Sequence, residues 1–253
     1  ENHIYYTDTE EFLDVIQYIY KDVADGKIVT VIRNMFQAGT GIYLDNIQHM
    51  YNIKEEYEPG KFRLAQVTEN YFSTGTLSNI TKDRQVWTSG ETALDTIQYT
   101  HKEWISKTID GVTKDVLVTV VRNYIKDASG VMYLESLQHI YKAEKMIKEN
   151  GQDVKRLVTV VENHVIFGGK DLIDTIQYSY KKIQDGVIKQ VTENYVRIGG
   201  KDYLENYQVS YYKKVNINYD GSERVVKVVE TYSVIDNVTI LDTLQYIYND
   251  VRN

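Results

Sequence analysis

Residues 157–180 read Leu-Val-Thr-Val-Val-Glu-Asn-His-Val-Ile-Phe-Gly-Gly-Lys-Asp-Leu-Ile-Asp-Thr-Ile-Gln-Tyr-Ser-Tyr, and this stretch decides the fold. Two runs rich in Val, Ile, Thr and Tyr flank the segment Gly168-Gly169-Lys170. Branched and aromatic residues favour strands, and glycines between two alternating runs favour a tight reversal of the chain. The stretch therefore predicts a β-hairpin with a short loop at 169–171.

The two halves of this hairpin recur along the whole chain. One half carries an aliphatic residue, an acid, any residue, a mostly apolar residue and Gln, in seven copies that end at Gln17, Gln48, Gln98, Gln138, Gln177, Gln208 and Gln245. The other half is valine-rich and ends in a charged residue followed by Asn, at Asn34, Asn70, Asn123, Asn163 and Asn194, with Glu230-Thr231 as the one departure. The sequence therefore predicts six tandem hairpins.

The spacing between the two motifs predicts which side chains share a face. From Asn163 to Gln177 the chain advances 14 residues, and three other repeats keep this spacing. An even spacing across a hairpin centred on Lys170 would set the Asn and the Gln opposite each other. Their face is uncharged, whereas the other face mixes charged, branched and aromatic residues such as Glu162 and Tyr178. We therefore expect the amide face to be the inner one and the mixed face to meet water.

Buried amides need hydrogen-bond partners, because an unsatisfied buried amide costs roughly 1–3 kcal/mol. Stacked Asn and Gln side chains can satisfy one another, so we expect them to form a structural amide belt. Its predicted members are Asn34, Gln48, Asn123, Gln138, Asn163, Gln177, Asn194, Gln208 and Gln245. The alternative is a lining that binds a polar ligand.

Thirteen strand motifs exceed the number that an open twisted sheet usually holds without curling. We therefore expect an all-β protein, an antiparallel meander of about six tandem β-hairpin repeats rolled into a barrel-like or two-layer body. The 253 residues are expected to form a single repeat domain, 1–253. Residues 76–90, which include Trp87, interrupt the second hairpin as an insertion.

The composition argues against several classes of partner. The net charge is −7 and no stretch concentrates Lys or Arg, so nucleic-acid binding is not expected. No apolar run approaches the roughly 20 residues of a spanning helix, so no membrane span is expected. The chain contains no Cys, which removes disulfide and thiolate chemistry. Its 23 Tyr suit strands whose aromatic faces tolerate water.

The motifs do not predict a catalytic, cofactor or metal site. His49 and His139 each follow a repeat's Gln, but Tyr99 and Tyr178 fill the same slot in other copies. A slot shared by His and Tyr indicates an aromatic pairing position rather than a metal ligand. The repeated acid lacks the dense alternating carboxylates of a calcium loop. Every carboxylate is a repeat element, whereas catalytic sites are usually singular. We therefore expect no enzyme activity and no cofactor.

Tandem repeats of this kind predict a non-enzymatic structural or adhesive protein of a cell surface, an extracellular matrix or filament, or a virion. A start at Glu1 rather than Met fits a processed and exported chain. Because the motifs open and close on a Gln-type strand, both edges are expected to be free to pair with other copies. The expected partners are therefore the protein itself or a surface glycan or protein.

The alternative function is a carbohydrate-binding module that uses amide-lined grooves and exposed tyrosine rings. Its candidate contact residues are Tyr178, Tyr180, Tyr211 and Trp87. Because the motif is repeated, such a module would offer several similar weak sites rather than one.

Overall fold

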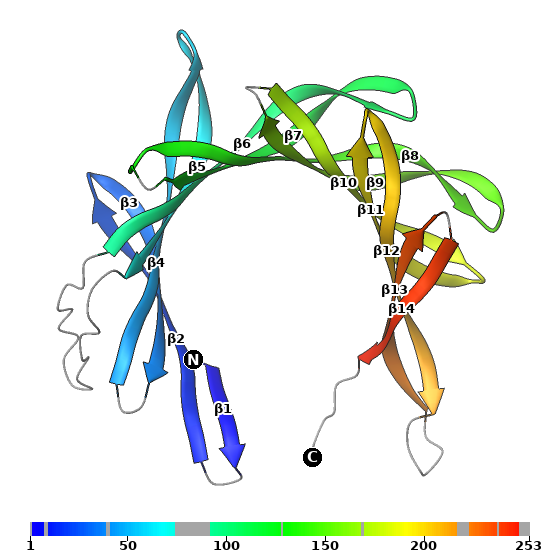
Figure 1. The fold of residues 1–253 in the computed structure, drawn as a ribbon, viewed down its shortest axis with the longest axis horizontal. Helices are drawn as coiled ribbons and strands as arrows, with labels where there is room; N and C mark the ends of the chain where they lie inside the picture. The colour runs from blue at the N-terminus through cyan, green and yellow to red at the C-terminus, as the bar shows by residue number, and fades with distance from the viewer. Residues whose placement is uncertain are drawn as a thin grey trace. The chain divides into compact units, whose positions relative to one another are not determined.

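The computed structural model describes residues 2–7, 10–38, 41–73, 92–127, 129–167, 170–216, 223–236 and 238–247. The predicted insertion at 76–90, with Trp87, lies outside them. The described strands (Figure 1) are β1 (Asn2–Thr7), β2 (Glu10–Ala24), β3 (Lys27–Ala38), β4 (Gly41–Glu58), β5 (Lys61–Ser73), β6 (Thr92–Ile109), β7 (Val112–Lys126), β8 (Met132–Glu149), β9 (Gln152–Phe167), β10 (Lys170–Gln184), β11 (Val187–Ile198), β12 (Lys201–Asn216), β13 (Glu223–Ile235) and β14 (Val238–Ile247).

The strands form one sheet in which their order in space is their order in the sequence. The predicted fold class, an all-β antiparallel meander of hairpins, is confirmed. Within the described residues, β1 and β14 each have a neighbouring strand on one side only. The described part of the chain contains no helix long and apolar enough to cross a membrane.

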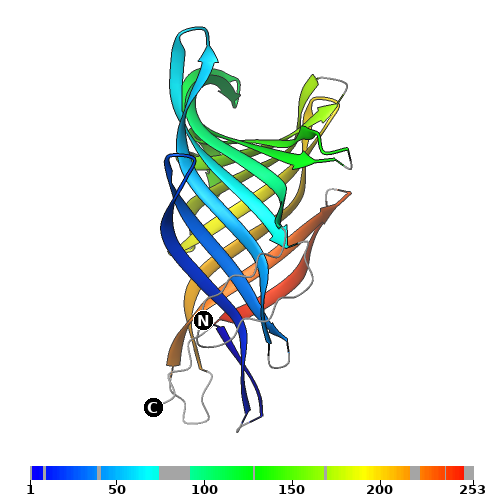
Figure 2. The ribbon, with the colours of Figure 1, turned by 90° about the vertical axis from the view of Figure 1, so that its left-hand side faces the viewer.

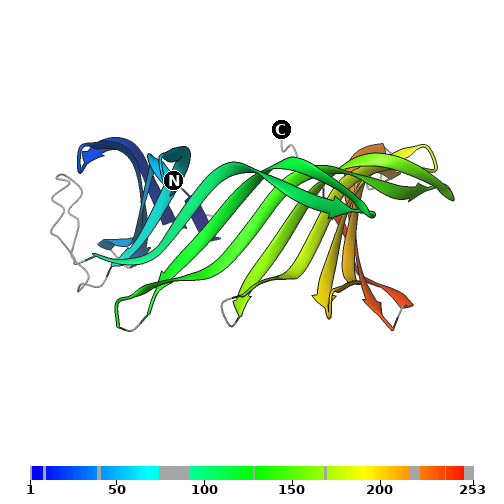
Figure 3. The same ribbon diagram turned by 90° about the horizontal axis from the view of Figure 1, so that it is seen from above.

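The chain divides into two compact units. Unit 1 comprises residues 1–102 and 121–136, and unit 2 comprises residues 103–120 and 137–253. In unit 1, the hairpins β2–β3 and β4–β5 lie side by side, drawn in blue to cyan in Figure 2. In unit 2, β9 to β12 run side by side across the sheet in Figure 3. The main hydrophobic cluster of unit 2 comes from these strands together with β7 and β8.

Two-residue turns close five hairpins with left-handed backbone at both positions, at φ from 48° to 82°: Asp25-Gly26, Asp110-Gly111, Asn150-Gly151, Asp185-Gly186 and Gly199-Gly200. Two successive positive φ angles are the geometry whose twist matches the flanking strands, and Asp, Asn and Gly tolerate it best. The loop predicted at 169–171 is wrong in its bounds, because Lys170 already belongs to β10 and faces Phe167.

Each of the four turns that begin with Asp or Asn lies midway between a Gln and the Asn that follows it. Across β8 and β9, Gln138 therefore faces Asn163, and across β10 and β11, Gln177 faces Asn194. The prediction that an Asn faces the Gln after it is wrong, since Asn163 faces Thr175 instead. The amides do pair, but each Asn pairs with the Gln that precedes it.

A β-bulge at the repeated acid causes this difference. In the β9–β10 pair, Asn163 faces Thr175 and His164 faces Ile173, so Asp174 has no partner in β9. The same register shift occurs at Asp45, Asp95, Glu205 and Asp242. The extra residue interrupts the alternation of faces, so residues on either side of the acid point to opposite faces of the sheet. The conspicuous acid of the Gln motif is therefore the residue that carries the bulge.

The buried face is the mixed one, which was expected to meet water. Val158 and Val160 are fully buried, and Ile176 is 2% exposed. On the amide face, by contrast, Asn163 is half-buried and Leu157 is 62% exposed. The predicted assignment of inner and outer faces is wrong, because valines and aromatic rings remove far more apolar surface from water than amides do. That face can be buried only if its acids are paired.

The array opens on an Asn-type strand rather than on the expected Gln-type strand. Asn2 of β1 faces Val15, and a register shift follows before His3. Asn163 has the same relation to Thr175, which also lies two residues before a Gln. Seven Asn-type strands, counting the one with Thr in place of Asn, therefore alternate with seven Gln-type strands. The edge strands β1 and β14 belong to different types.

Candidate functional site

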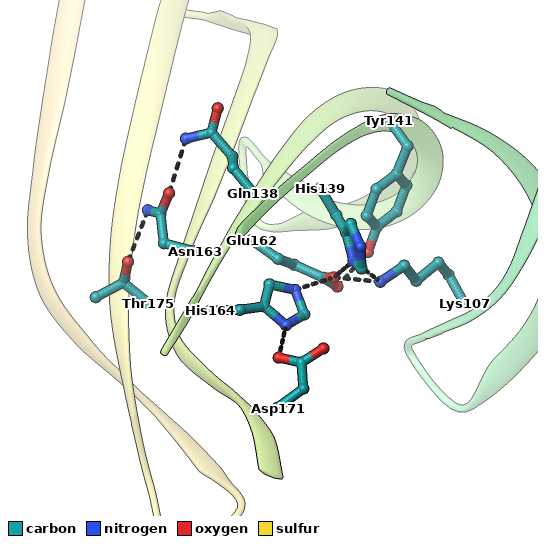
Figure 4. A network of polar contacts seen from close by, with 9 residues as sticks. All are labelled: Lys107, Gln138, His139, Tyr141, Glu162, Asn163, His164, Asp171 and Thr175. Atoms are coloured by element: carbon teal, nitrogen blue, oxygen red, sulfur yellow. Dashed lines mark hydrogen bonds and ion pairs between the residues drawn. The ribbon is translucent and has the colours of Figure 1, made fainter. Parts of the chain in front are cut away.

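The amide face carries a relay of hydrogen bonds. Gln138 Nε2 donates to Asn163 Oδ1 at 2.8 Å, and Asn163 Nδ2 donates to Thr175 Oγ1 at 2.8 Å (Figure 4). The same pairing joins Gln17 to Asn34, Gln48 to Asn70, Gln98 to Asn123 and Gln177 to Asn194. The second acceptors are then Asn46, Thr96, Ser136 and Asn206. Each relay links three successive strands through side chains alone.

The relay weakens toward the last strand. Gln208 Nε2 lies 3.5 Å from Thr231 Oγ1, because Thr stands where the other repeats have Asn. Gln245 of β14 faces Val229 of β13 and is exposed. Within the described residues, Gln245 has no side-chain hydrogen bond, since no described strand pairs with the second edge of β14.

On the buried face, paired tyrosine hydroxyls compensate the acids. Glu193 accepts hydrogen bonds from Tyr180 at 2.7 Å and from Tyr195 at 3.1 Å. The equivalent groups are Glu69 with Tyr51 and Tyr71, and Glu230 with Tyr211 and Tyr232. Hydrogen bonds to an ionised acceptor are about twice as strong as neutral ones, so two phenols can hold a carboxylate out of water. These triads explain how a face that contains acids forms the core.

One repeat replaces the second tyrosine by histidine, and here a denser cluster forms (Figure 4). Glu162 of β9 accepts hydrogen bonds from Tyr141 at 2.6 Å and from Lys107 at 2.5 Å. His139 Nδ1 lies 3.7 Å and His164 Nε2 lies 3.5 Å from Glu162 Oε2. We call Lys107, His139, Tyr141, Glu162 and His164 the Glu162 cluster; all five belong to unit 2.

The electrostatics of the Glu162 cluster favour an ionised carboxylate. Burial alone raises the pKa of Glu162, but its polar contacts with His139, His164, Lys107 and Tyr141 outweigh burial and hold the pKa far below its ordinary value. Burial and the bond to Glu162 raise the pKa of Tyr141, which therefore stays a neutral donor. The ammonium of Lys107 also lies 5.4 Å from the centre of the Tyr141 ring. The site is a buried anion that accepts hydrogen bonds from the Lys107 ammonium and the Tyr141 hydroxyl.

The slot shared by His and Tyr is an aromatic pairing position, as the sequence indicated. The ring of His49 lies 5.1 Å from that of Tyr71, and Tyr178 meets Tyr195 edge to face at 5.5 Å. His139 and His164 make the same contact at 4.4 Å. The sequence analysis did not combine these last two histidines into a site, because it predicted no register between the strands that carry them. The turn signal Asn150-Gly151 lies midway between Gln138 and Asn163 in the sequence. It could have predicted that these two residues face each other, which also brings His139 and His164 close together.

The tyrosines proposed as a contact surface lie in different environments. Tyr178 is 8% exposed and Tyr180 is 7% exposed, so the expectation that both present their rings to solvent is wrong. Tyr211 is half-buried, with its hydroxyl bonded to Glu230. Trp87 lies outside the described residues. The rings of Tyr178 and Tyr180 are core side chains, which leaves little of the predicted stacking surface.

A groove of about 360 Å³ lies in unit 2 between the ends of the β6–β7 and β8–β9 hairpins. Its apolar floor is bordered by five lysines, Lys107, Lys114, Lys142, Lys145 and Lys155. Glu144 pairs with Lys114 at 3.0 Å and with Lys155 at 3.1 Å, and Asp110 accepts from the backbone nitrogen of Met146 at 2.9 Å. These contacts fasten the β6–β7 turn onto β8.

The last described strand presents an unusual edge. All ten residues of β14 are exposed, on both faces. Six of them are large and apolar, with exposed fractions from 45% to 59%: Val238, Ile240, Leu241, Leu244, Tyr246 and Ile247. Asp242 is the one charged residue of the strand. Soluble proteins usually protect such an edge with lysines, prolines or a covering element.

Comparisons with known proteins add little to this description. Neither protein-family models nor curated proteins match the chain. A crystal structure of a protein of unknown function from Bacteroides fragilis NCTC 9343 is similar to 58% of this chain and is covered over 93% of its own length. The identity is 14% and the TM-score is 0.32.

Proposed function

We propose that this protein is a non-enzymatic structural repeat protein of a cell surface or extracellular assembly, whose copies join by pairing β14 of one copy with β1 of the next. The observation that carries the proposal is the complementarity of the two edges. β14, the last described strand, is of the Gln type, and β1, the first described strand, is of the Asn type. Pairing them would continue the alternation that runs through the whole sheet.

The register supports this pairing in detail. In the β2–β3, β4–β5, β8–β9 and β10–β11 pairs, the Gln and the Asn are directly opposite and bonded through their amides, as Gln177 and Asn194 are. Gln245 is the member of the series whose amide has no partner within the described residues. Asn2 holds the Asn register position in β1. A strand added to β14 with Asn2 opposite Gln245 would complete the relay.

The surface of β14 supports the same conclusion. A strand exposed on both faces and rich in Ile, Leu and Tyr is a template for another strand, because its free N–H and C=O groups and apolar side chains both gain partners. Heterologous contacts of this head-to-tail kind generate rings when the rotation closes and filaments when it does not. A repeat protein with such ends can therefore serve as a building block.

The test is size-exclusion chromatography with light scattering, combined with negative-stain imaging over a range of concentrations. The wild-type protein is expected to form oligomers, fibres or rings that grow with concentration. Leu244→Lys places a charge in the proposed contact and is expected to abolish assembly. The matched control is Leu172→Lys, a leucine of similar exposure on the interior strand β10, at 47% against 45%. A wild-type protein that stays monomeric at high concentration would overturn the proposal.

The runner-up hypothesis, a carbohydrate-binding module, depended on exposed tyrosine rings, and the structure buries two of them, Tyr178 and Tyr180. Dispersed compact particles in the imaging experiment would favour a binding module over a building block and would make a glycan screen the next experiment.

A further inference from the structure

Three potential metal ligands converge in the Glu162 cluster. The ring nitrogens of His139 and His164 and a carboxylate oxygen of Glu162 all lie within 4.8 Å of one another. The residues are 9%, 5% and 6% exposed, respectively. In a tetrahedral zinc site with ordinary bond lengths near 2.0–2.1 Å, neighbouring ligand atoms are about 3.3 Å apart. The two His–Glu separations of 3.7 and 3.5 Å are close to that value.

His164 is already held in the orientation that a metal ligand needs. Its Nδ1 lies 2.7 Å from Asp171 Oδ1, so the neutral ring donates its proton there and keeps its lone pair on Nε2. That Nε2 is buried and has no hydrogen-bond partner, and it lies on the side of Glu162. A carboxylate behind a histidine is the usual outer support of a metal-binding imidazole.

Two of the three side chains, His139 and Glu162, already contact a positive charge, the ammonium group of Lys107. Lys107 Nζ lies 2.9 Å from His139 Nδ1 and 2.5 Å from Glu162 Oε2, so the ammonium group sits among the same atoms. His139 thus directs a lone pair at a positive charge, as it would at a metal. The long lysine side chain reaches the cluster from β6, and Lys107 also lines the groove of unit 2.

We propose that His139, Glu162 and His164 bind a divalent transition metal of the zinc class, which takes the place of the Lys107 ammonium and ties β8 to β9. Imidazole nitrogen with one carboxylate suits zinc, cobalt, nickel or copper better than magnesium or calcium. A fourth position remains for water. Asp171 acts as the positioning residue behind His164.

The other repeats show that the histidines are not needed for folding. Glu193 occupies the position equivalent to Glu162, and Tyr180 and Tyr195 satisfy it without any histidine. His164 therefore stands where Tyr195 stands one repeat later. The variant His164→Tyr therefore removes a ligand and introduces the side chain that the next repeat carries at the equivalent position, Tyr195.

The experiment uses full-length protein stripped with EDTA, titrated with zinc by calorimetry and with cobalt by visible absorption. Wild type is expected to bind one metal per chain, with the intense cobalt bands of tetrahedral coordination. His164→Tyr should weaken binding at least 100-fold, and Asp171→Asn should weaken it about 10-fold. Lys107→Met removes the competing cation and should tighten binding. His49→Tyr, outside the cluster, is the matched control and should bind as wild type does.

Circular dichroism of the His164→Tyr variant verifies that it is folded, so that a loss of binding reports on the ligand. Zinc should also raise the melting temperature of wild type but not of His164→Tyr. Three results would overturn the proposal: no binding by wild type, equal binding by His164→Tyr, or binding by Lys107→Met alone.

Discussion

Gln138 of β8 donates a hydrogen bond of 2.8 Å to Asn163 of β9, and the two residues lie directly opposite each other about the turn Asn150-Gly151. Because the Asn163 amide donates onward to Thr175, the bond is one step of a relay that crosses three strands. The relay fixes register on the wetter face of the sheet, while the valines and the Tyr–Glu triads fill the other. The contribution of each Gln–Asn pair to stability can therefore be measured by substitution within its own repeat.

Replacing Asn163 by alanine removes both steps of its relay. The Gln138 amide loses its acceptor and Thr175 loses its donor, at half-buried positions. We expect the free energy of unfolding to fall by about 1–2 kcal/mol. Urea denaturation monitored by circular dichroism measures it. Gln208→Ala, whose bond is 3.5 Å long and exposed, is the control and should cost less than about 0.5 kcal/mol.

Neutralising Glu162 should destabilise the protein more than neutralising any other acid of the Tyr–Glu series. In Glu162→Gln the Lys107 ammonium loses the carboxylate it contacts at 2.5 Å in a buried site. Breaking a buried ion pair from one side costs about 3–5 kcal/mol. Glu193→Gln, which leaves only two phenols without a charged acceptor, should cost about 1–3 kcal/mol.

The double variant Glu162→Gln with Lys107→Met completes the cycle. Removing the lysine as well should recover part of the stability lost in Glu162→Gln, because no uncompensated charge then remains. If the double variant is as unstable as the sum of the two single variants, Lys107 and Glu162 do not act as a pair.

The same carboxylate makes stability depend on acid pH. The pKa of Glu162 is lowered in the folded protein from its ordinary value of 4.5, since the hydrogen bonds it accepts outweigh the opposing effect of burial. Its contribution is therefore complete above about pH 4.5 and is lost as the pH falls further below that value. In urea melts at successive pH values below 5, wild type should lose stability more steeply than Glu162→Gln. Parallel curves would contradict this assignment.

Alkaline pH tests the buried tyrosines. Burial raises the pKa of Tyr178 to about 12, above its ordinary value of 10.0. The folded protein therefore favours the neutral form of the Tyr178 phenol. Its contribution to the free energy of unfolding is complete below pH 10 and is lost as the pH rises toward 12. Tyr178→Phe should lose less stability than wild type between pH 10 and pH 12. Tyrosinate absorbance and circular dichroism measure ionisation and unfolding over this range. Tyr212→Phe, at a position 68% exposed, should lose as much stability as wild type does.

The sequence predicted the strands and their order as hairpins because the alternation of residue types along a strand is a local signal. It did not predict the register, since the constant spacing from Asn163 to Gln177 spans a bulge at Asp174 that adds one unpaired residue. The assignment of the buried face was wrong for a related reason. A lone Glu162 or Glu193 reads as a surface residue until its tyrosine donors, which come from neighbouring strands, are in place. A site whose side chains come from three strands cannot be predicted from the sequence until the register of those strands is known.

The most direct test of the proposed assembly joins its two edges covalently. The chain contains no cysteine, so Asn2→Cys with Gln245→Cys introduces the only two thiols. Directly opposite residues on paired strands have Cα atoms about 4.5–5.5 Å apart, within the range of a disulfide. Mild oxidation should give a ladder of covalent dimers, trimers and larger species, and far less from Asn2→Cys with Thr243→Cys. A covalent monomer, or no cross-link at all, would contradict head-to-tail pairing of β14 with β1.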